Sequence, residues 1–278
     1  MTDSPGAGRP RPFRSDYHMH TKWSGHATGE MRDYVETGVA RGLAEIGFSV
    51  HMPITIPFEK KLYLSKDEMP LYIDEARRLQ DEFAGRILIL IGGECDYAPG
   101  QEDEIETAIS AYPFDYMYGA IHFIDGWSHD NPECKDRWET GDVAAIYRRY
   151  YELLCAAARS GFYDIVSHFD LVKKFGYRPQ EDVSESEEAA AEAVARAGMA
   201  VEINTSGFDK PAREQYPSES ILRRLCKKGV PVCFGSDAHA PHEVARHFDR
   251  AYPLAHSVGW RTLARFQGRR RFEVPLTV

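Results

Sequence analysis

Short apolar runs alternate with amphipathic stretches of helical period along almost the whole chain. This alternation is typical of parallel strands joined by helices. We expect strands at seven places, which are residues 14–20, 45–51, 87–94, 116–123, 164–168, 199–204 and 231–236. Seven strand–helix units fit a closed parallel barrel better than an open doubly wound sheet, although the pattern alone leaves the open sheet as an alternative.

The segments between the predicted strands carry signals of helix ends. Ser65 precedes an acidic first turn, while Gly161 and Gly198 follow two amphipathic stretches. We expect helices at residues 30–41, 66–83, 102–111, 142–159, 185–197 and 218–228, and a last helix after residue 241. The predicted fold class is therefore α/β, with helices between successive strands.

The chain is long enough for one α/β barrel, and no internal repeat or linker divides it. Residues 1–13 are rich in Gly, Pro and Arg and lack an apolar stretch, so we interpret them as a flexible leader rather than a signal peptide. Residues 14–278 then form a single domain.

The formal net charge is −9, which argues against a nucleic-acid partner because Lys and Arg are not in excess. The cluster of Arg269, Arg270 and Arg271 is too short to change this, and we interpret it as a solvated helix end. Five scattered cysteines without a CxxC spacing indicate reduced thiols in the cytoplasm. No apolar run is long enough to span a membrane. The oligomeric state stays open.

Ligand-type side chains gather where the predicted strands end. His18 and His20 lie two residues apart on the first strand, so both side chains point to the same face. The C-terminal ends of the strands are where barrel folds build their sites. The nine candidate metal ligands are His18, His20, His26, His51, Glu94, His122, His168, Asp237 and His239. The other histidines, His129, His242, His247 and His256, are not assigned to the site.

Nine nitrogen and oxygen ligands are too many for one ion. Imidazoles and carboxylates without a thiolate suit Zn²⁺, Mn²⁺ or Fe²⁺. Glu94 is the one Glu among the nine, and a carboxylate can bridge two metals. The sequence therefore predicts two to three divalent transition-metal ions, which bind phosphate oxygens and activate water.

The ordered motifs of this chain resemble those of the PHP (polymerase and histidinol phosphatase) superfamily and, within it, the histidinol-phosphate phosphatases. The motifs are DYHMH from Asp16, GHATGEM from Gly25, EIGFSVHMP from Glu45, GGECDYAPG from Gly92, GAIHFIDGW from Gly119, DIVSHFDLVKKFG from Asp164, VEINTSG from Val201 and GSDAHAP from Gly235. The resemblance implies a single distorted (β/α)7 barrel that hydrolyses a small phosphate monoester such as L-histidinol phosphate. A metal-bound hydroxide would attack the phosphorus atom.

The resemblance also implies a trinuclear centre. One metal would be held by His18, His20, Glu94 and Asp237, the second by Glu94, His122 and His168, and the third by His26, His51 and His239. Glu94, Asp237 and His239 are the catalytic candidates, and the proton for the leaving alkoxide could come from Asp237, His239 or metal-bound water. Lys173, Lys210, Arg213 and Asp209 are the candidate substrate contacts. Tyr97, Trp127 and Phe208 are candidates either for the pocket wall or for the core.

The chain departs from the pattern of its relatives at three places. Val50 stands where an acid usually precedes the second-strand histidine, and Asp209 stands where an arginine is usual, with Arg213 nearby. His242 and Ala245 replace residues that are usually Glu and Gly. Asp209 raises the main alternative, which is a diverged enzyme that uses the same metal centre on a specialised metabolite. A C–N hydrolase and an inactive structural module are further alternatives.

Overall fold

The computed structural model describes residues 13–54 and 63–277. Seven parallel strands form one sheet in the order β1-β2-β3-β4-β7-β8-β9. Their bounds are β1 Ser15–Asp16, β2 Glu45–His51, β3 Leu88–Asp96, β4 Tyr116–Ala120, β7 Ile165–Val166, β8 Ala200–Asn204 and β9 Val232–Gly235. The first and last strands meet, since Tyr17 N donates to Phe234 O at 3.1 Å and Met19 forms a parallel bridge with Ala238. The predicted barrel of seven strands is confirmed, and it is nearly closed.

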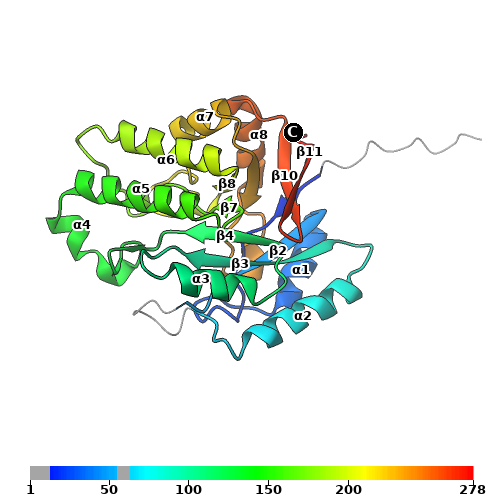
Figure 1. Cartoon of the computed structure of the whole chain (residues 1–278). Coiled ribbons are helices and arrows are strands. Elements are labelled where there is room, and N and C mark those ends of the chain that lie inside the picture. The colour runs from blue at the N-terminus through cyan, green and yellow to red at the C-terminus, as the bar shows by residue number, and fades with distance from the viewer. Residues whose placement is uncertain (1–12, 55–62, 278) are drawn as a thin grey trace, which may run out of the picture.

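Helices separate the strands and pack around the barrel (Figure 1). They are α1 Met31–Ala40, α2 Met69–Glu82, α3 Glu102–Ser110, α4 Asp136–Thr140, α5 Val143–Ser160, α6 Ser184–Ala197, α7 Glu219–Lys227 and α8 Phe248–Val258. Helix α5 shows why the sequence sets these bounds. The Asp142 side chain accepts a hydrogen bond from Ala145 N, and Gly161 follows the helix with a left-handed φ of 77°.

The chain between the strands and helices contains shorter elements that the sequence pattern did not predict. A small hairpin is formed by β5 Phe123–Ile124 and β6 Trp127–Ser128. Four 3-10 turns are η1 Pro132–Cys134, η2 Leu171–Lys173, η3 Ser206–Asp209 and η4 Pro241–Glu243. Strands β1 and β7 have only two residues each, so several predicted ligands lie in the loops just beyond the ladder.

A tyrosine fills much of the barrel interior. The Tyr116 hydroxyl donates to the carbonyl oxygens of Tyr17 at 2.7 Å and Phe48 at 3.0 Å. A Cβ atom on Gly92 would lie 2.3 Å from the Tyr116 ring, and a Cβ atom on Gly47 would lie 2.3 Å from its hydroxyl. The two glycines therefore make room for one large side chain at the centre of the barrel.

A C-terminal hairpin of β10 Thr262–Gln267 and β11 Arg270–Pro275 covers one end of the barrel. Phe266 is 1% exposed and belongs to the same buried cluster as Leu90 and Ile165 at the starts of β3 and β7. Figure 1 shows the hairpin (red) at the end of the barrel opposite α4. The interpretation of Arg269, Arg270 and Arg271 as a helix end is therefore wrong. Arg269 lies in the two-residue turn, with a φ of 62°, and pairs with Asp164.

None of the helices that the structure describes has the length and apolar character needed to cross a membrane.

Candidate metal centre

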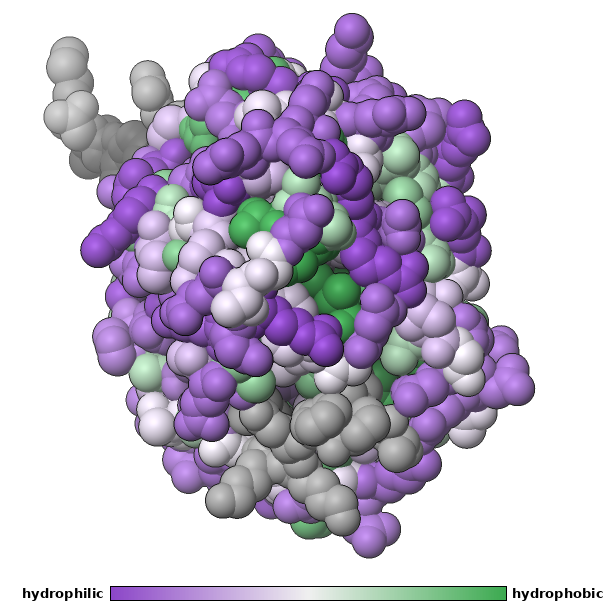
Figure 2. Space-filling view, turned by 90° about the vertical axis from the view of Figure 1, so that its left-hand side faces the viewer, coloured by the Kyte–Doolittle hydropathy of each residue, from purple (hydrophilic) through white to green (hydrophobic). Residues whose placement is uncertain are grey.

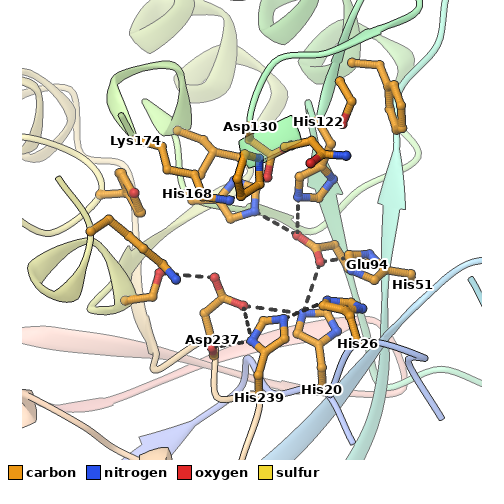
Figure 3. Close-up of a pocket in the computed structure, with 18 of the residues that line it drawn as sticks. His20, His26, His51, Glu94, His122, Asp130, His168, Lys174, Asp237 and His239 are labelled. Carbon is orange, nitrogen blue, oxygen red and sulfur yellow. Dashed lines mark hydrogen bonds and ion pairs between the residues drawn. The ribbon is translucent and has the colours of Figure 1, made fainter. Parts of the chain in front are cut away.

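The carboxyl ends of the strands surround a cavity of about 460 Å³ at the end of the barrel away from the β10–β11 hairpin. Figure 2 views the left-hand side of Figure 1 and shows a hollow near the centre of a largely hydrophilic face. Seven imidazole or carboxylate groups predicted as ligands line the cavity together with Asp237 (Figure 3): His20, His26, His51, Glu94, His122, His168 and His239. His18 lies just behind them and is fully buried. The structure therefore brings all nine predicted ligands to one place.

Glu94 is the centre of this cluster. It lies two residues before the end of strand β3, is 1% exposed, and points its carboxylate between two groups of imidazoles (Figure 3). Oxygen Oε2 lies 3.3 Å from Nε2 of His18, 3.4 Å from Nε2 of His20 and 3.3 Å from Nδ1 of His51. Oxygen Oε1 lies 3.0 Å from Nε2 of His168 and 3.8 Å from Nε2 of His122. One carboxylate thus faces five imidazole nitrogens.

Asp237 supplies the second carboxylate on the other side of the His18 and His20 pair. Its Oδ1 atom lies 3.6 Å from Nε2 of His18 and 3.4 Å from Nε2 of His20. Next to it, Nε2 of His239 lies 2.8 Å from Nε2 of His26. Two ring nitrogens this close repel each other through their lone pairs. The repulsion is relieved if one nitrogen carries a hydrogen or if a cation binds both.

The spacing of these atoms fits metal coordination. Zinc–nitrogen and zinc–oxygen bonds of about 2.0–2.1 Å place tetrahedral ligands about 3.3–3.4 Å apart, which is the spacing found around Oε2 of Glu94. That oxygen and Nδ1 of His51 are buried, yet neither forms a hydrogen bond with any residue that the structure describes. Three sets of ligand atoms lie close enough to share an ion: His18, His20 and Asp237; His20, His51 and Glu94; Glu94, His122 and His168.

The ionisation of Glu94 and of two imidazoles suits metal binding, whereas nearby carboxylates raise the pKa of His18 and His20 in spite of burial. Burial would raise the pKa of Glu94, but the nearby His18 and His122 outweigh burial and hold it well below the usual range. Burial, with His20 beside it, lowers the pKa of His26 to about 3, and the same two causes lower that of His239 to about 4. Ionised carboxylates and neutral imidazoles are the forms that bind a metal ion.

Buried acids orient two of the imidazoles, and the sequence reasoning missed them. Oε1 of Glu202, on β8, accepts a hydrogen bond from Nδ1 of His18 at 2.7 Å. Oδ1 of Asp96, on β3, lies 3.0 Å from Nδ1 of His122. Burial alone would lower the pKa of His122, but the carboxylates of Asp96 and Glu94 raise it to about 10. Such partners fix the ring orientation and raise the basicity of the ligand.

Val50, the first departure from the relatives' pattern, is a core residue with 2% exposure. His51 therefore has no acid at the preceding position, and among the described residues the nearest carboxylate to its Nδ1 atom is Glu94, at 3.3 Å.

The candidate substrate contacts divide into one residue in the cavity and three outside it. Lys210 lines the cavity. Lys173 does not, and its assignment is corrected: the side chain is fully buried, where the ammonium pairs with Asp170 at 2.8 Å and donates to Gln215 O at 2.8 Å. Lys174, its neighbour, lines the cavity instead and pairs with Asp130 at 2.9 Å. Residue 173 belongs to the 3-10 turn η2, and one step along such a turn changes the direction of the side chain by about a third of a circle.

Asp209 and Arg213 also lie outside the cavity lining. Both side chains are exposed, and the Asp209 carboxylate contacts Nε2 of His247 at 2.9 Å and NH1 of Arg246 at 3.6 Å. The acid that departs from the relatives' pattern therefore faces two basic side chains of this chain. Arg246 lines the cavity and was not predicted.

The aromatic candidates pack outside the cavity. Tyr97 and Trp127 are each 8% exposed, and their polar atoms bond to Glu102 and to Cys134 O. Phe208 packs under Arg250, whose guanidinium carbon lies 3.7 Å from the ring centroid. All three therefore serve packing rather than the cavity wall.

A parallel barrel with a histidine and carboxylate cluster at its strand ends defines a metal-dependent hydrolase fold. The model of the PHP domain family matches residues 16–206, and the chain belongs to this family. It is 38% identical over 248 residues to a probable histidinol-phosphatase of Deinococcus radiodurans, a match that covers 89% of this chain and 95% of that protein. It is 28% identical over 260 residues to the histidinol-phosphatase of Bacillus subtilis, covering 85% of this chain and 97% of that one.

The fold is similar to that of a solved relative. The crystal structure of histidinol phosphate phosphatase from Lactococcus lactis, complexed with zinc, L-histidinol and phosphate, matches with a TM-score of 0.81 and 25% identity. The match covers 93% of this chain and 98% of that chain. The resemblance that the motifs indicated is confirmed.

Proposed function

We propose that this protein is a metal-dependent phosphatase that hydrolyses L-histidinol phosphate. The observation that carries the proposal is the Glu94 carboxylate, which faces five imidazole nitrogens on the wall of a cavity large enough for a small phosphate ester. The relative that binds zinc, L-histidinol and phosphate has the same fold over 93% of this chain and supports the choice of substrate.

The cluster is suited to hold two to three divalent transition-metal ions, with zinc the first candidate because a relative of the same fold binds it. Glu94 would be shared between ions, with His18, His20 and Asp237 on one side and His122 and His168 on the other. The structure places His51 beside Glu94, whereas the resemblance groups it with His26 and His239, so that part of the partition stays a prediction. When bound, the ions supply positive charge for the phosphate and lower the pKa of water.

The cavity has separate groups for the two halves of the substrate. Lys210 lines the cavity, and its ammonium forms no ion pair with the residues that the structure describes, so we assign it to the phosphate. Asp130 and Lys174 lie on the wall remote from Asp237 (Figure 3). A carboxylate at that wall suits a substrate that carries an amine as well as a phosphate.

Asp237 and His239 are better suited to binding metal than to donating a proton. Burial would raise the pKa of Asp237, but His18 and the other nearby imidazoles hold it well below the usual range. Burial and the neighbouring His20 lower the pKa of His239 to about 4. Near neutral pH Asp237 is therefore ionised and His239 is uncharged, and neither is a ready source of the proton for the leaving alkoxide.

The diverged-substrate alternative depended on Asp209. Because this carboxylate contacts His247 and Arg246 and does not line the cavity, it gives no reason to expect another substrate. Cys95, Cys155 and Cys233 are buried free thiols, which supports our expectation of a cytoplasmic enzyme.

Phosphate release from a panel of monoesters tests the proposal. We expect zinc-loaded protein to hydrolyse L-histidinol phosphate with a kcat/KM at least about tenfold above that for phosphoserine, glycerol phosphate and ribose phosphate, equivalent to about 1.4 kcal/mol in transition-state stabilisation. Release from every ester except histidinol phosphate would contradict the substrate assignment. Release from none would contradict the phosphatase itself.

A further inference from the structure

Arg246 lines the cavity, but its guanidinium donates hydrogen bonds to other residues of the protein. The side chain is 13% exposed. Its Nε atom donates to Ser236 O at 2.9 Å, and NH2 donates to Asp237 O at 2.7 Å. NH1 donates to Oε1 of Glu243 at 2.9 Å. One planar group thus holds the carbonyl oxygens of two consecutive residues and one carboxylate.

The backbone that Arg246 holds is strained. Asp237 has a φ of 51°, in the left-handed region that a non-glycine residue adopts at a cost of about 1 kcal/mol or more. The segment that carries Arg246 is also unusual, because its neighbours Ala245 and His247 have φ values of 54° and 56°. Asp16 ties the two strained segments together, since its carboxylate accepts from Ser236 N at 2.9 Å and from Ala245 N at 2.7 Å.

The same contacts determine how His239 is presented. Its Nδ1 atom lies 2.9 Å from Asp237 O, the carbonyl oxygen that Arg246 also holds. A carbonyl oxygen can only accept, so Nδ1 carries the hydrogen and Nε2 keeps its lone pair toward His26. Glu243 links Arg246 to His239 a second time. Its Oε1 atom accepts from Arg246, and its Oε2 atom accepts from His239 N at 2.7 Å.

We propose that Arg246 is a positioning residue that sets both Asp237 and His239 for metal binding. Glu243 holds the guanidinium from one side, and Asp209, with Oδ2 3.6 Å from NH1, contributes charge from the other. We call the hydrogen bonds of Arg246 to Ser236, Asp237 and Glu243 the clamp. Asp209 supports the cation of this clamp, which fixes the backbone just after β9. The inference rests on the proposed metal centre but not on the identity of the substrate.

The test measures metal affinity without any substrate, so a failure to hydrolyse histidinol phosphate leaves it intact. Metal-free protein is titrated with Zn²⁺ against a competing chelator, and with Co²⁺ while its visible absorption is recorded. Arg246→Met keeps the aliphatic stem and removes the clamp. We expect the zinc ions held by Asp237 and by His239 to bind roughly 10 to 100-fold more weakly, as for the loss of other groups that orient metal ligands, with a changed Co²⁺ spectrum for those ions and not for an ion at Glu94, His122 and His168.

Two variants sharpen the test. Arg250→Met removes the same charge at an exposed position of α8, where the guanidinium stacks on Phe208, and this variant should bind every ion like the wild type. Arg246→Lys should recover only part of the lost affinity, because an ammonium cannot reproduce the planar set of donors. Should Arg246→Met not fold, Glu243→Gln should weaken the binding of the same ions. Wild-type affinity for all ions in the clamp variants, or equal weakening in Arg250→Met, would overturn the proposal.

Discussion

The carboxylate of Asp209 was a candidate substrate contact, but its surroundings make it an ion-pair partner of two basic side chains. It lies beside His247 and Arg246 at the rim, with 47% of the side chain exposed. An arginine at this position would face two basic groups, and like charges in a half-exposed site repel. We therefore expect Asp209→Arg to leave kcat/KM for histidinol phosphate unchanged or reduced, as measured by phosphate release. A tenfold increase would return residue 209 to the substrate site.

At the same scale, the convergence of the nine candidate ligands could be predicted because strand periodicity and strand ends constrain their positions directly. The buried acids Glu202 and Asp96 could also have been found. Each lies in an apolar strand, where an unpaired acid is costly, and Asp96 follows Glu94 by two residues. The choice between Lys173 and Lys174 could not be made, because a short 3-10 turn has no sequence period that tells which lysine faces the cavity.

Among the elements, the loop that follows β8 is held in place by a buried ion pair rather than by a helix or strand ladder. Lys173, in the turn η2, reaches this loop by donating to Gln215 O, while its partner Asp170 accepts from Ser218 N at 2.9 Å. Removing one partner of a buried pair leaves an uncompensated charge. We expect Lys173→Met to lower the free energy of unfolding by about 3 kcal/mol, measured by urea denaturation.

Lys228→Met is the matched control for this prediction. Lys228 pairs with Glu188 at 2.7 Å and Glu192 at 2.8 Å on the surface, where such pairs contribute less than about 1 kcal/mol. Equal losses in the two variants would show that the buried position of Lys173 adds nothing to its contribution to stability.

The β10–β11 hairpin was not predicted from the sequence, because an arginine-rich strand lacks the apolar alternation that identified the other strands.

Across the whole molecule, the two ends of the barrel have different tasks. The β10–β11 hairpin closes one end with Phe266 and ion pairs to Glu45 and Asp164, whereas the other end carries the cavity. The barrel itself followed from the alternation of strand and helix patterns, since that pattern has few solutions. The nearly complete closure between β1 and β9 depends on Tyr17 and Met19, which lie just past the end of β1, and no local pattern encodes their contacts.

Acid should destabilise the fold through His129, which lies outside the cavity lining. Its Nε2 atom donates to Ile121 O at 2.8 Å, and burial lowers its pKa from 6.5 to about 4. A lowered folded-state pKa means that the unfolded chain binds the proton first. The contribution of neutral His129 to the free energy of unfolding is complete above pH 6.5. It is lost as the pH falls toward 4, by about 3 kcal/mol in all.

His129→Gln removes this titration and keeps a donor for the Ile121 carbonyl. We expect its free energy of unfolding, measured on metal-free protein by denaturant titration, to fall less steeply than that of the wild type between pH 6.5 and pH 4. The metal ligands titrate in both proteins and cancel in the comparison. Parallel curves for the two proteins would show that His129 does not carry this dependence.

The most direct test of a metal-dependent phosphatase is to return zinc stepwise to metal-free protein while phosphate release from L-histidinol phosphate is followed. The account predicts no release without metal, an increase with each added ion, and a plateau at about two to three ions per chain, the number proposed from the three overlapping ligand sets. Glu94→Gln, which removes the shared carboxylate, should stay inactive at every zinc level. Full activity in metal-free protein, or wild-type activity of Glu94→Gln, would contradict the account.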